Sequence, residues 1–150
     1  MKSFFSLLAF SLVLTTSFIT STSFAADMNS AVGNWLTIDD KTGKAKSVVN
    51  ITQVGDELRG SITKLMDPAK QNAVCEECKG PNKDKPIKGL VMMWGLKKAG
   101  SGWAGGRILD PSNGKVYKAK MSLADGGKKL NVRGYIGFSL LGRTQTWVRQ

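Results

Sequence analysis

Apolar and polar side chains alternate along most of the chain after residue 31, and turn-forming residues interrupt the alternation at short intervals. In the clearest example, which follows Lys115, one side carries Tyr117, Ala119 and Met121 and the other carries mainly lysine. A period of two residues is typical of a β-strand with one buried face. The pattern predicts eight strands, over residues 32–38, 45–54, 57–65, 87–96, 103–109, 115–123, 130–136 and 144–149.

Most of the predicted strands are joined by turns of hairpin length, of which Asp-Pro-Ser-Asn-Gly at 110–114 is the clearest. The exception is a long irregular segment, 67–86, between the third and fourth strands. Strands with one apolar face that follow one another through hairpins favour an antiparallel up-and-down order. We therefore predict an all-β, eight-stranded antiparallel barrel, which leaves no edge strand unpaired. An open sandwich of the same strands is the alternative.

The first 25 residues have the pattern of a secretory signal peptide. Lys2 precedes an apolar run over 4–19, and the small residues Ser23 and Ala25 stand at the two positions that signal peptidase reads. We predict cleavage after Ala25 and a single β-barrel domain over 26–150, located in the periplasm or secreted. The alternative is a membrane anchor, but the apolar run is short for a spanning helix. No transmembrane segment is expected in the mature chain.

The amino-acid composition favours some binding partners and excludes several kinds of catalytic and metal site. The chain has 22 Lys and Arg against 11 Asp and Glu, a formal net charge of +11, which favours anionic partners. It has no His and two Cys, which excludes histidine-based catalysis and a Cys/His zinc site within one chain. Asp39, Asp40 and Asp110 lie in predicted turns, where Asp caps the backbone. We predict no enzyme activity, no metal and no cofactor. We also predict no nucleic-acid partner, since no nucleic-acid-binding motif is present.

Several motifs resemble the exported bacterial family known as domain of unknown function 2147: Gly33-Asn34-Trp35 and the segments 39–44, 75–78, 83–87, 105–111, 132–135 and 142–147. The Gly-x-Trp on the first strand is also similar to the lipocalin signature. That resemblance implies a lipocalin-like barrel, with Gly33 and Trp35 packed at its closed end under Arg149 or Arg143. The family has no assigned activity.

The Cys75-Glu-Glu-Cys78 motif predicts a structural disulfide in an exported protein. A bridge that closes so small a loop adds about 2 kcal/mol in the loop-entropy model. The alternative is a thiol-disulfide redox pair. The two intervening glutamates disfavour the thiolate that this chemistry requires.

Residues 90–94, Leu-Val-Met-Met-Trp, are apolar on both faces. One face is expected to line the barrel, and the other must be covered by the long loop, a dimer partner or a ligand. The side chains that we expect to line a ligand are Met92, Trp94, Trp103, Tyr117, Met121 and Ile136. The side chains that we expect to contact an anion are Lys79, Lys83, Lys85 and Lys88.

Three functional hypotheses follow, and the thiol-disulfide pair of Cys75 and Cys78 described above is the third. The first is non-catalytic binding or carriage of a small, mostly apolar, lipid-like envelope ligand, with a cation at the rim of the barrel. The second is a structural or interaction protein of the cell envelope, with a filled barrel that acts through its basic surface on an anionic partner. An eight-stranded barrel is close to the size at which side chains either fill it or leave room for one small ligand, so the sequence leaves the first two open.

Overall fold

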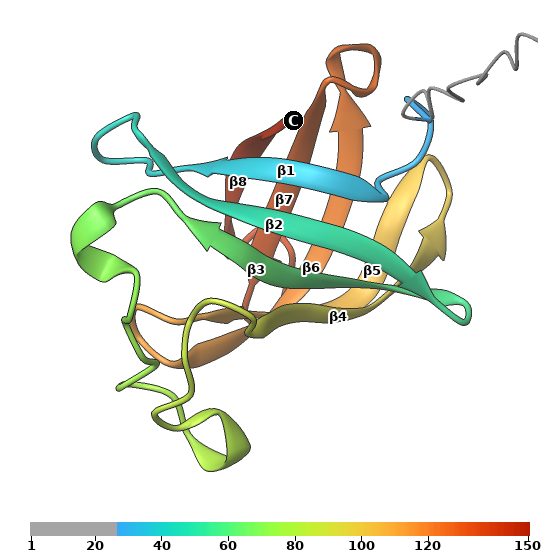
Figure 1. The fold of residues 1–150 in the computed structure, drawn as a ribbon. Coiled ribbons are helices and arrows are strands. Elements are labelled where there is room, and N and C mark those ends of the chain that lie inside the picture. The colour runs from blue at the N-terminus through green and yellow to red at the C-terminus, as the bar shows by residue number, and fades with distance from the viewer. Residues whose placement is uncertain (1–26) are drawn as a thin grey trace, which may run out of the picture.

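The computed structural model describes residues 27–150, so the predicted signal peptide lies outside the described residues. Eight strands follow one another along the chain (Figure 1). They are β1 (Gly33–Ile38), β2 (Ala45–Val54), β3 (Glu57–Leu65), β4 (Val91–Ala99), β5 (Gly102–Asp110), β6 (Lys115–Ala124), β7 (Lys129–Tyr135) and β8 (Gly142–Arg149). Three single-turn 3-10 helices complete the elements: η1 (Pro68–Lys70), η2 (Gly80–Asn82) and η3 (Asp125–Gly127).

Each strand pairs antiparallel with its neighbours in the sequence, and β1 pairs with β8 to close a barrel. The predicted eight-stranded up-and-down barrel is confirmed, and the open sandwich is excluded. Because the strands alternate in direction, the barrel has two distinct ends. One end carries the β2–β3, β4–β5 and β6–β7 turns together with both ends of the described chain; we call it the closed end. The other, which we call the open end, carries the four remaining loops.

The predicted fourth strand starts too early. Residues 87–90 belong to the long loop, and β4 begins at Val91. Gly89, at φ +93°, turns the backbone out of the extended conformation just before the strand. No helix within residues 27–150 is long and apolar enough to cross a membrane.

Inward-facing side chains fill the middle of the barrel. The largest side chains with less than 2% exposure are, by volume, Trp35, Trp147, Ile51, Leu58, Met93, Leu96, Leu130 and Val49. They come from β1, β2, β3, β4, β7 and β8, so the core is shared around the barrel. Close packing of this kind makes the hydrophobic interior the main source of stability.

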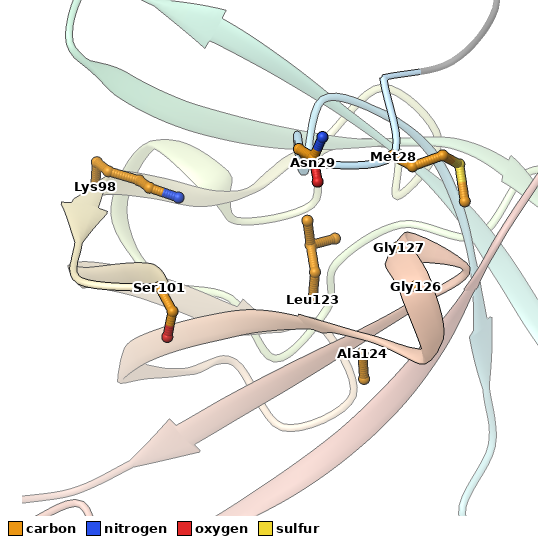
Figure 2. A pocket seen from close by; sticks show the side chains of 8 residues that line it. All are labelled: Met28, Asn29, Lys98, Ser101, Leu123, Ala124, Gly126 and Gly127. Atoms are coloured by element: carbon orange, nitrogen blue, oxygen red, sulfur yellow. The ribbon is translucent and has the colours of Figure 1, made fainter.

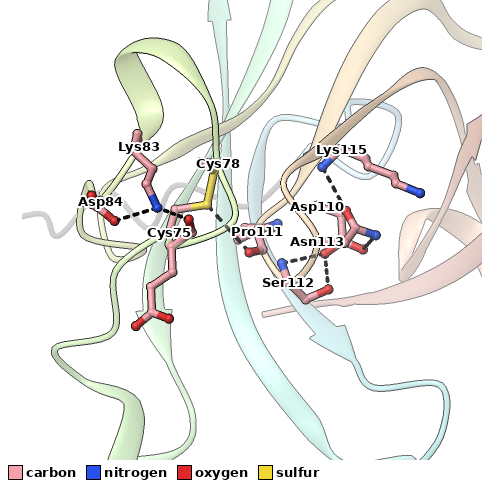
Figure 3. The surroundings of a disulfide bond; sticks show 10 residues. Cys75, Cys78, Lys83, Asp84, Asp110, Pro111, Ser112, Asn113 and Lys115 are labelled. Atoms are coloured by element: carbon pink, nitrogen blue, oxygen red, sulfur yellow. Dashed lines mark hydrogen bonds and ion pairs between the residues drawn. A yellow bond between two sulfur atoms is a disulfide. The ribbon is translucent and has the colours of Figure 1, made fainter.

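The long loop between β3 and β4, green in Figure 1, extends from the open end of the barrel. Its cysteines form the predicted disulfide, Cys75–Cys78 (Figure 3). Both are buried in a second apolar cluster with Leu90 and Leu109, against which Trp94 packs. The bridge is local in sequence, but this cluster also holds the loop to β4 and β5.

The β5–β6 turn lies in close contact with the disulfide loop. Cys75 Sγ lies 3.6 Å from the carbonyl oxygen of Pro111. Gly114 has φ +67°, and a side chain there would overlap the Glu77 carbonyl. Glycine is therefore required both by the turn and by the approach of the loop.

Trp94 was expected to line the interior, and this is wrong. Met92 and Met93 both pack into the barrel core, and β3 and β4 shift register beside them. A bulge of this kind turns the next side chain to the opposite face. Trp94 therefore pairs with the exposed Arg107 and points outward, where the long loop covers it. The long loop, one of the three covers that the sequence allowed, therefore packs against this face.

Replacing both cysteines by alanine is expected to lower the free energy of unfolding by about 2 kcal/mol, the loop-closure contribution of a short bridge. The loop should loosen from the barrel and expose Trp94. Acrylamide quenching of tryptophan fluorescence measures this exposure, with a Trp94→Phe version of the same variant as the control. Quenching equal to that of the parent protein would contradict the covering role of the disulfide loop.

Candidate functional site

The closed end is organised around Trp35. This side chain is fully buried, and its indole Nε1 donates a hydrogen bond of 2.8 Å to the carbonyl of Ala31. The Arg149 guanidinium stacks over the ring, 4.3 Å from its centroid. Such a cation-π contact is stronger where water is partly excluded.

Arg149 also ties three segments together through backbone carbonyls. Its Nε donates to Gly127 at 2.8 Å, its Nη2 to Ser30 at 2.6 Å and its Nη1 to Val32 at 3.2 Å. These bonds join β8 to the N-terminal segment and to the β6–β7 turn. Burial lowers the pKa of Arg149 below its ordinary value, and the charge of Asp27 partly offsets this.

Gly33 makes room for this arrangement. Its φ of +135° is one that L side chains rarely adopt, and a Cβ there would lie 3.2 Å from Arg149 Nη1. The structure thus places Gly33, Trp35 and Arg149 together at the closed end.

Arg143 does not join them. It lies at the open end, where it forms an ion pair with Asp40 and remains 64% exposed. Arg143 lies six residue steps before Arg149 on one extended strand, which corresponds to about 20 Å. The alternative closed-end partner is therefore wrong.

Two hollows mark the surface of the described residues. The first, about 420 Å³, lies at the closed end between the N-terminal segment and the β4–β5 and β6–β7 turns (Figure 2). Asn29, Lys98 and Leu123 are among the residues around it. The second, about 390 Å³, is lined partly by the outer face of β6 to β8, where Lys120, Arg133 and Thr144 are cross-strand neighbours. Both are shallow and wide, unlike the enclosed sites that bury a small ligand.

The side chains that were expected to line a ligand do not form one site, although Trp103 and Met121 are cross-strand partners that border the second hollow. Met92, Trp103 and Met121 are buried in the packed core. Tyr117 is half-buried near the open end. Ile136 was also expected to face the interior, and this is wrong: it is 64% exposed in the β7–β8 loop because β7 ends at Tyr135.

Polar side chains link β1 to β8 toward the open end. The two strands share only two residue pairs, Trp35 with Arg149 and Leu36 with Val148. Beyond these pairs, Gln145 Nε2 donates to Asp40 at 2.9 Å, and the Trp147 indole donates to Gln145 Oε1 at 3.3 Å.

Nearby, the hydroxyls of Thr37 and Ser47 are both buried and share a hydrogen bond of 2.8 Å. Polar groups within a barrel need such partners, so this side of the open end is fixed and hydrophilic.

Half-buried apolar side chains lie on the β5–β7 side of the same end. Ile108 pairs with Tyr117, and both face inward. Gly134 adjoins them: a Cβ there would lie 3.4 Å from Ile108 Cγ2 and 3.5 Å from Tyr117 Cβ. Gly134 also pairs with Arg143 across β7 and β8, which connects the apolar side to the polar side. We call this set the open-end cluster: Asp40, Ile108, Tyr117, Gly134, Arg143 and Gln145.

The loop lysines expected to contact an anion are all exposed: Lys79, Lys83, Lys85 and Lys88. Lys83 also serves the loop itself, since its Nζ donates to the carbonyl of Glu76 and lies 3.2 Å from Asp84 (Figure 3). Three or more metal-ligating side chains do not gather anywhere in residues 27–150.

The β7–β8 loop forms a surface that the sequence pattern did not predict. Ile136, Phe138, Leu140 and Leu141 are all exposed there. The signal was an apolar run between glycines at a position where a turn would ordinarily be polar.

Comparison with known proteins agrees with this geometry. A family model described as "Uncharacterized protein conserved in bacteria (DUF2147)" matches residues 33–149. The chain belongs to the DUF2147 family. Among solved structures it is similar to protein HP1028 from the human pathogen Helicobacter pylori, described as belonging to the lipocalin family. The TM-score is 0.71 at 20% identity, over 81% of this chain and 83% of that chain. No curated protein matches.

These findings confirm the predicted DUF2147 membership and the lipocalin-like fold. The structural likeness concerns the fold alone.

Trp35→Ala is expected to lower the free energy of unfolding by about 3–5 kcal/mol, because it removes a buried aromatic side chain and leaves a cavity. Urea unfolding measures the change. Val116→Ala, at a position that is 51% exposed, is the control and should stay within about 0.5 kcal/mol of the parent. A Trp35→Ala variant as stable as this control would refute the closed-end packing.

Replacing each arginine by methionine separates the two ends. Arg149→Met removes the stacked cation and three hydrogen bonds, and should cost about 2 kcal/mol of stability. Arg143→Met removes one exposed ion pair, worth less than about 1 kcal/mol. Urea unfolding of both variants provides the comparison, and equal losses would argue against the role of Arg149 at the closed end.

Proposed function

We propose that this protein is a non-catalytic binding protein that takes a small amphipathic ligand at the open end of its barrel. The observation that carries the proposal is the two-sided character of the open-end cluster. Its β5–β7 side is apolar and half-buried, at Ile108 and Tyr117, and its β1–β8 side is polar, at Asp40, Arg143 and Gln145.

The closed end offers less to an apolar ligand. Trp35, Arg149 and the N-terminal segment pack across it, and the core beneath them is filled. A ligand that entered there would have to displace fully buried side chains, at a cost of several kcal/mol. Inward-facing side chains at the open end retain partial exposure, so a ligand there could bury new apolar surface.

The polar side of the cluster suits a negative or hydrogen-bonding head group. A guanidinium has five N–H donors, and the pair with Asp40 uses Nη2 of Arg143. Arg143 can therefore contact a carboxylate or phosphate while it holds Asp40. An apolar body against Ile108 and Tyr117 with an anionic head at Arg143 describes a lipid-like molecule.

The buried disulfide supports a role in binding rather than in redox chemistry. Exchange requires a thiolate to reach one sulfur of the bridge. Within the long loop, Cys75 is fully buried and Cys78 is 3% exposed. We assign the pair a structural role. A lipocalin-like barrel is also a fold more typical of ligand binding than of catalysis.

The periplasm or the exterior of the cell is the proposed location. A structural disulfide persists in an oxidising compartment, and the first 25 residues have the pattern of a signal peptide. The leading alternative function is an envelope interaction protein that acts through its basic surface. The filled core favours it, because a packed interior has no room for a guest.

The first experiment is native mass spectrometry of the naturally processed protein, purified from its own cells without detergent. We expect an adduct of defined mass that disappears on denaturation and that identifies the ligand class. A bare protein mass, unchanged after incubation with an envelope lipid extract, would favour the interaction protein instead.

Gly134→Leu should block the site, because the new side chain would extend between Ile108 and Tyr117 without close overlap at its Cβ. We expect dodecanoate, an apolar chain with one carboxylate, to bind about tenfold or more weakly to this variant in calorimetric titrations. Thr146→Leu adds a similar side chain to the exposed outer side of β8 and is the control. Equal affinity of the two variants for dodecanoate would refute the open-end site.

A further inference from the structure

The β7–β8 loop exposes an apolar tip. Four of its side chains are largely in contact with solvent: Ile136 at 64%, Phe138 at 78%, Leu140 at 89% and Leu141 at 70%. Scattered exposed apolar side chains are normal, but a cluster on one protruding loop marks an interaction surface. We call these four residues the apolar tip. No role for it follows from the open-end cluster.

The backbone of this loop is held by hydrogen bonds rather than left open to water. Arg133 Nε donates to the Ser139 carbonyl at 2.6 Å, and its Nη2 donates to the Leu140 carbonyl at 3.2 Å. Lys118 Nζ lies 3.5 Å from the Gly137 carbonyl. The loop therefore exposes its apolar side chains to solvent, while the side chains of Arg133 and Lys118 contact its backbone carbonyls.

Internal bonds complete the loop. The Leu141 amide donates to the Phe138 carbonyl at 3.0 Å, and the Ile136 amide donates to the Leu141 carbonyl at 3.3 Å. Apolar surroundings penalise backbone groups that have no partner. A loop whose backbone groups are paired in this way can enter such surroundings at a lower cost than an open one.

We propose that the apolar tip inserts into the interface of an anionic phospholipid bilayer. Phe and Leu side chains gain free energy on entering the boundary between head groups and acyl chains, and basic residues beside them attract anionic head groups. The cations beside the tip are Lys118 and Arg133, whose side chains contact the loop backbone, and Arg143 near the start of β8. The net charge of +11 adds a general attraction to such a surface.

Charge also argues against a second copy of the chain as the occupant. A symmetric contact would bring Lys118 and Arg133 close to their own copies, and like charges across an interface repel. The tip is also small: a stable protein interface covers roughly 800 Å² on each partner and about 20–30 residues. Four side chains on one loop are better suited to shallow insertion into lipid.

This inference goes beyond the proposed function and does not depend on it, because the open-end cluster could bind its ligand with or without a membrane. The apolar tip and the open-end cluster nevertheless lie at the same end of the barrel. A lipid-like ligand taken from a bilayer would have a short path to the cluster.

Flotation with lipid vesicles tests the proposal. The naturally processed protein is mixed with vesicles of phosphatidylcholine alone, or of phosphatidylcholine and phosphatidylglycerol. We expect it to float with the anionic vesicles, less so as salt screens the charges. The double variant Phe138→Ser, Leu140→Ser should bind about tenfold or more weakly. The control is Val54→Ser, Val116→Ser, which changes two exposed valines outside the loop, 43% and 51% exposed, and should bind as the parent does.

Any of three results would overturn the proposal. One is the failure of the parent protein to float with the anionic vesicles, and a second is equal flotation of the loop variant and the control. The third is self-association of the parent, seen by sedimentation and abolished in the loop variant, which would make the tip a contact between copies. Calorimetry with dodecanoate on the same loop variant separates the two ideas: unchanged binding leaves the open-end site standing whatever the vesicles show.

Discussion

The contact between Arg149 and Trp35 is the constraint on which the rest of the barrel depends. A barrel of eight strands closes only if the last strand meets the first, and here β8 and β1 share two residue pairs. So short a ladder has few hydrogen bonds to hold the join. Arg149 compensates with its position over the Trp35 ring and its three bonds to backbone carbonyls. These contacts fix the closed end of the barrel. Within residues 27–150, the open end has no such contact and therefore differs from it.

At the open end the join between β1 and β8 continues through side chains. Asp40, Arg143 and Gln145 connect the strands where backbone pairing has stopped. Side-chain links are easier to rearrange than a backbone ladder, because exposed ion pairs contribute little to stability. The same end carries half-buried apolar residues and the apolar tip. The disulfide loop covers the outer face of β4 and β5. The open end is therefore the part of the described barrel that is best suited to binding partners.

Much of the fold followed from the sequence, because alternation reports directly on which face of a strand is buried. The strand set, the disulfide and the roles of Gly33 and Trp35 were all predictable. Trp94 was not, because the register of β4 shifts beside Met92 and Met93 and turns Trp94 to the opposite face. No pattern of residue types marks such a register shift. Likewise, the choice between Arg149 and Arg143 depends on contacts with residues more than 100 positions away, Ser30 and Asp40. The apolar residues of the tip could be identified in the sequence, but their exposure could not be predicted. That exposure depends on where β7 ends and on the hydrogen bonds from Arg133 to the loop backbone.

The central claim is that binding belongs to the open end because the closed end is fixed. Backbone amide chemical shifts, followed by NMR while dodecanoate is added to the naturally processed protein, test this most directly. We predict that the largest shifts fall on Ile108, Tyr117, Gly134 and Gln145, with the amides of Ala31, Trp35 and Arg149 unmoved. Shifts concentrated at Asn29, Leu123 and Gly127, around the closed-end hollow, would contradict the account.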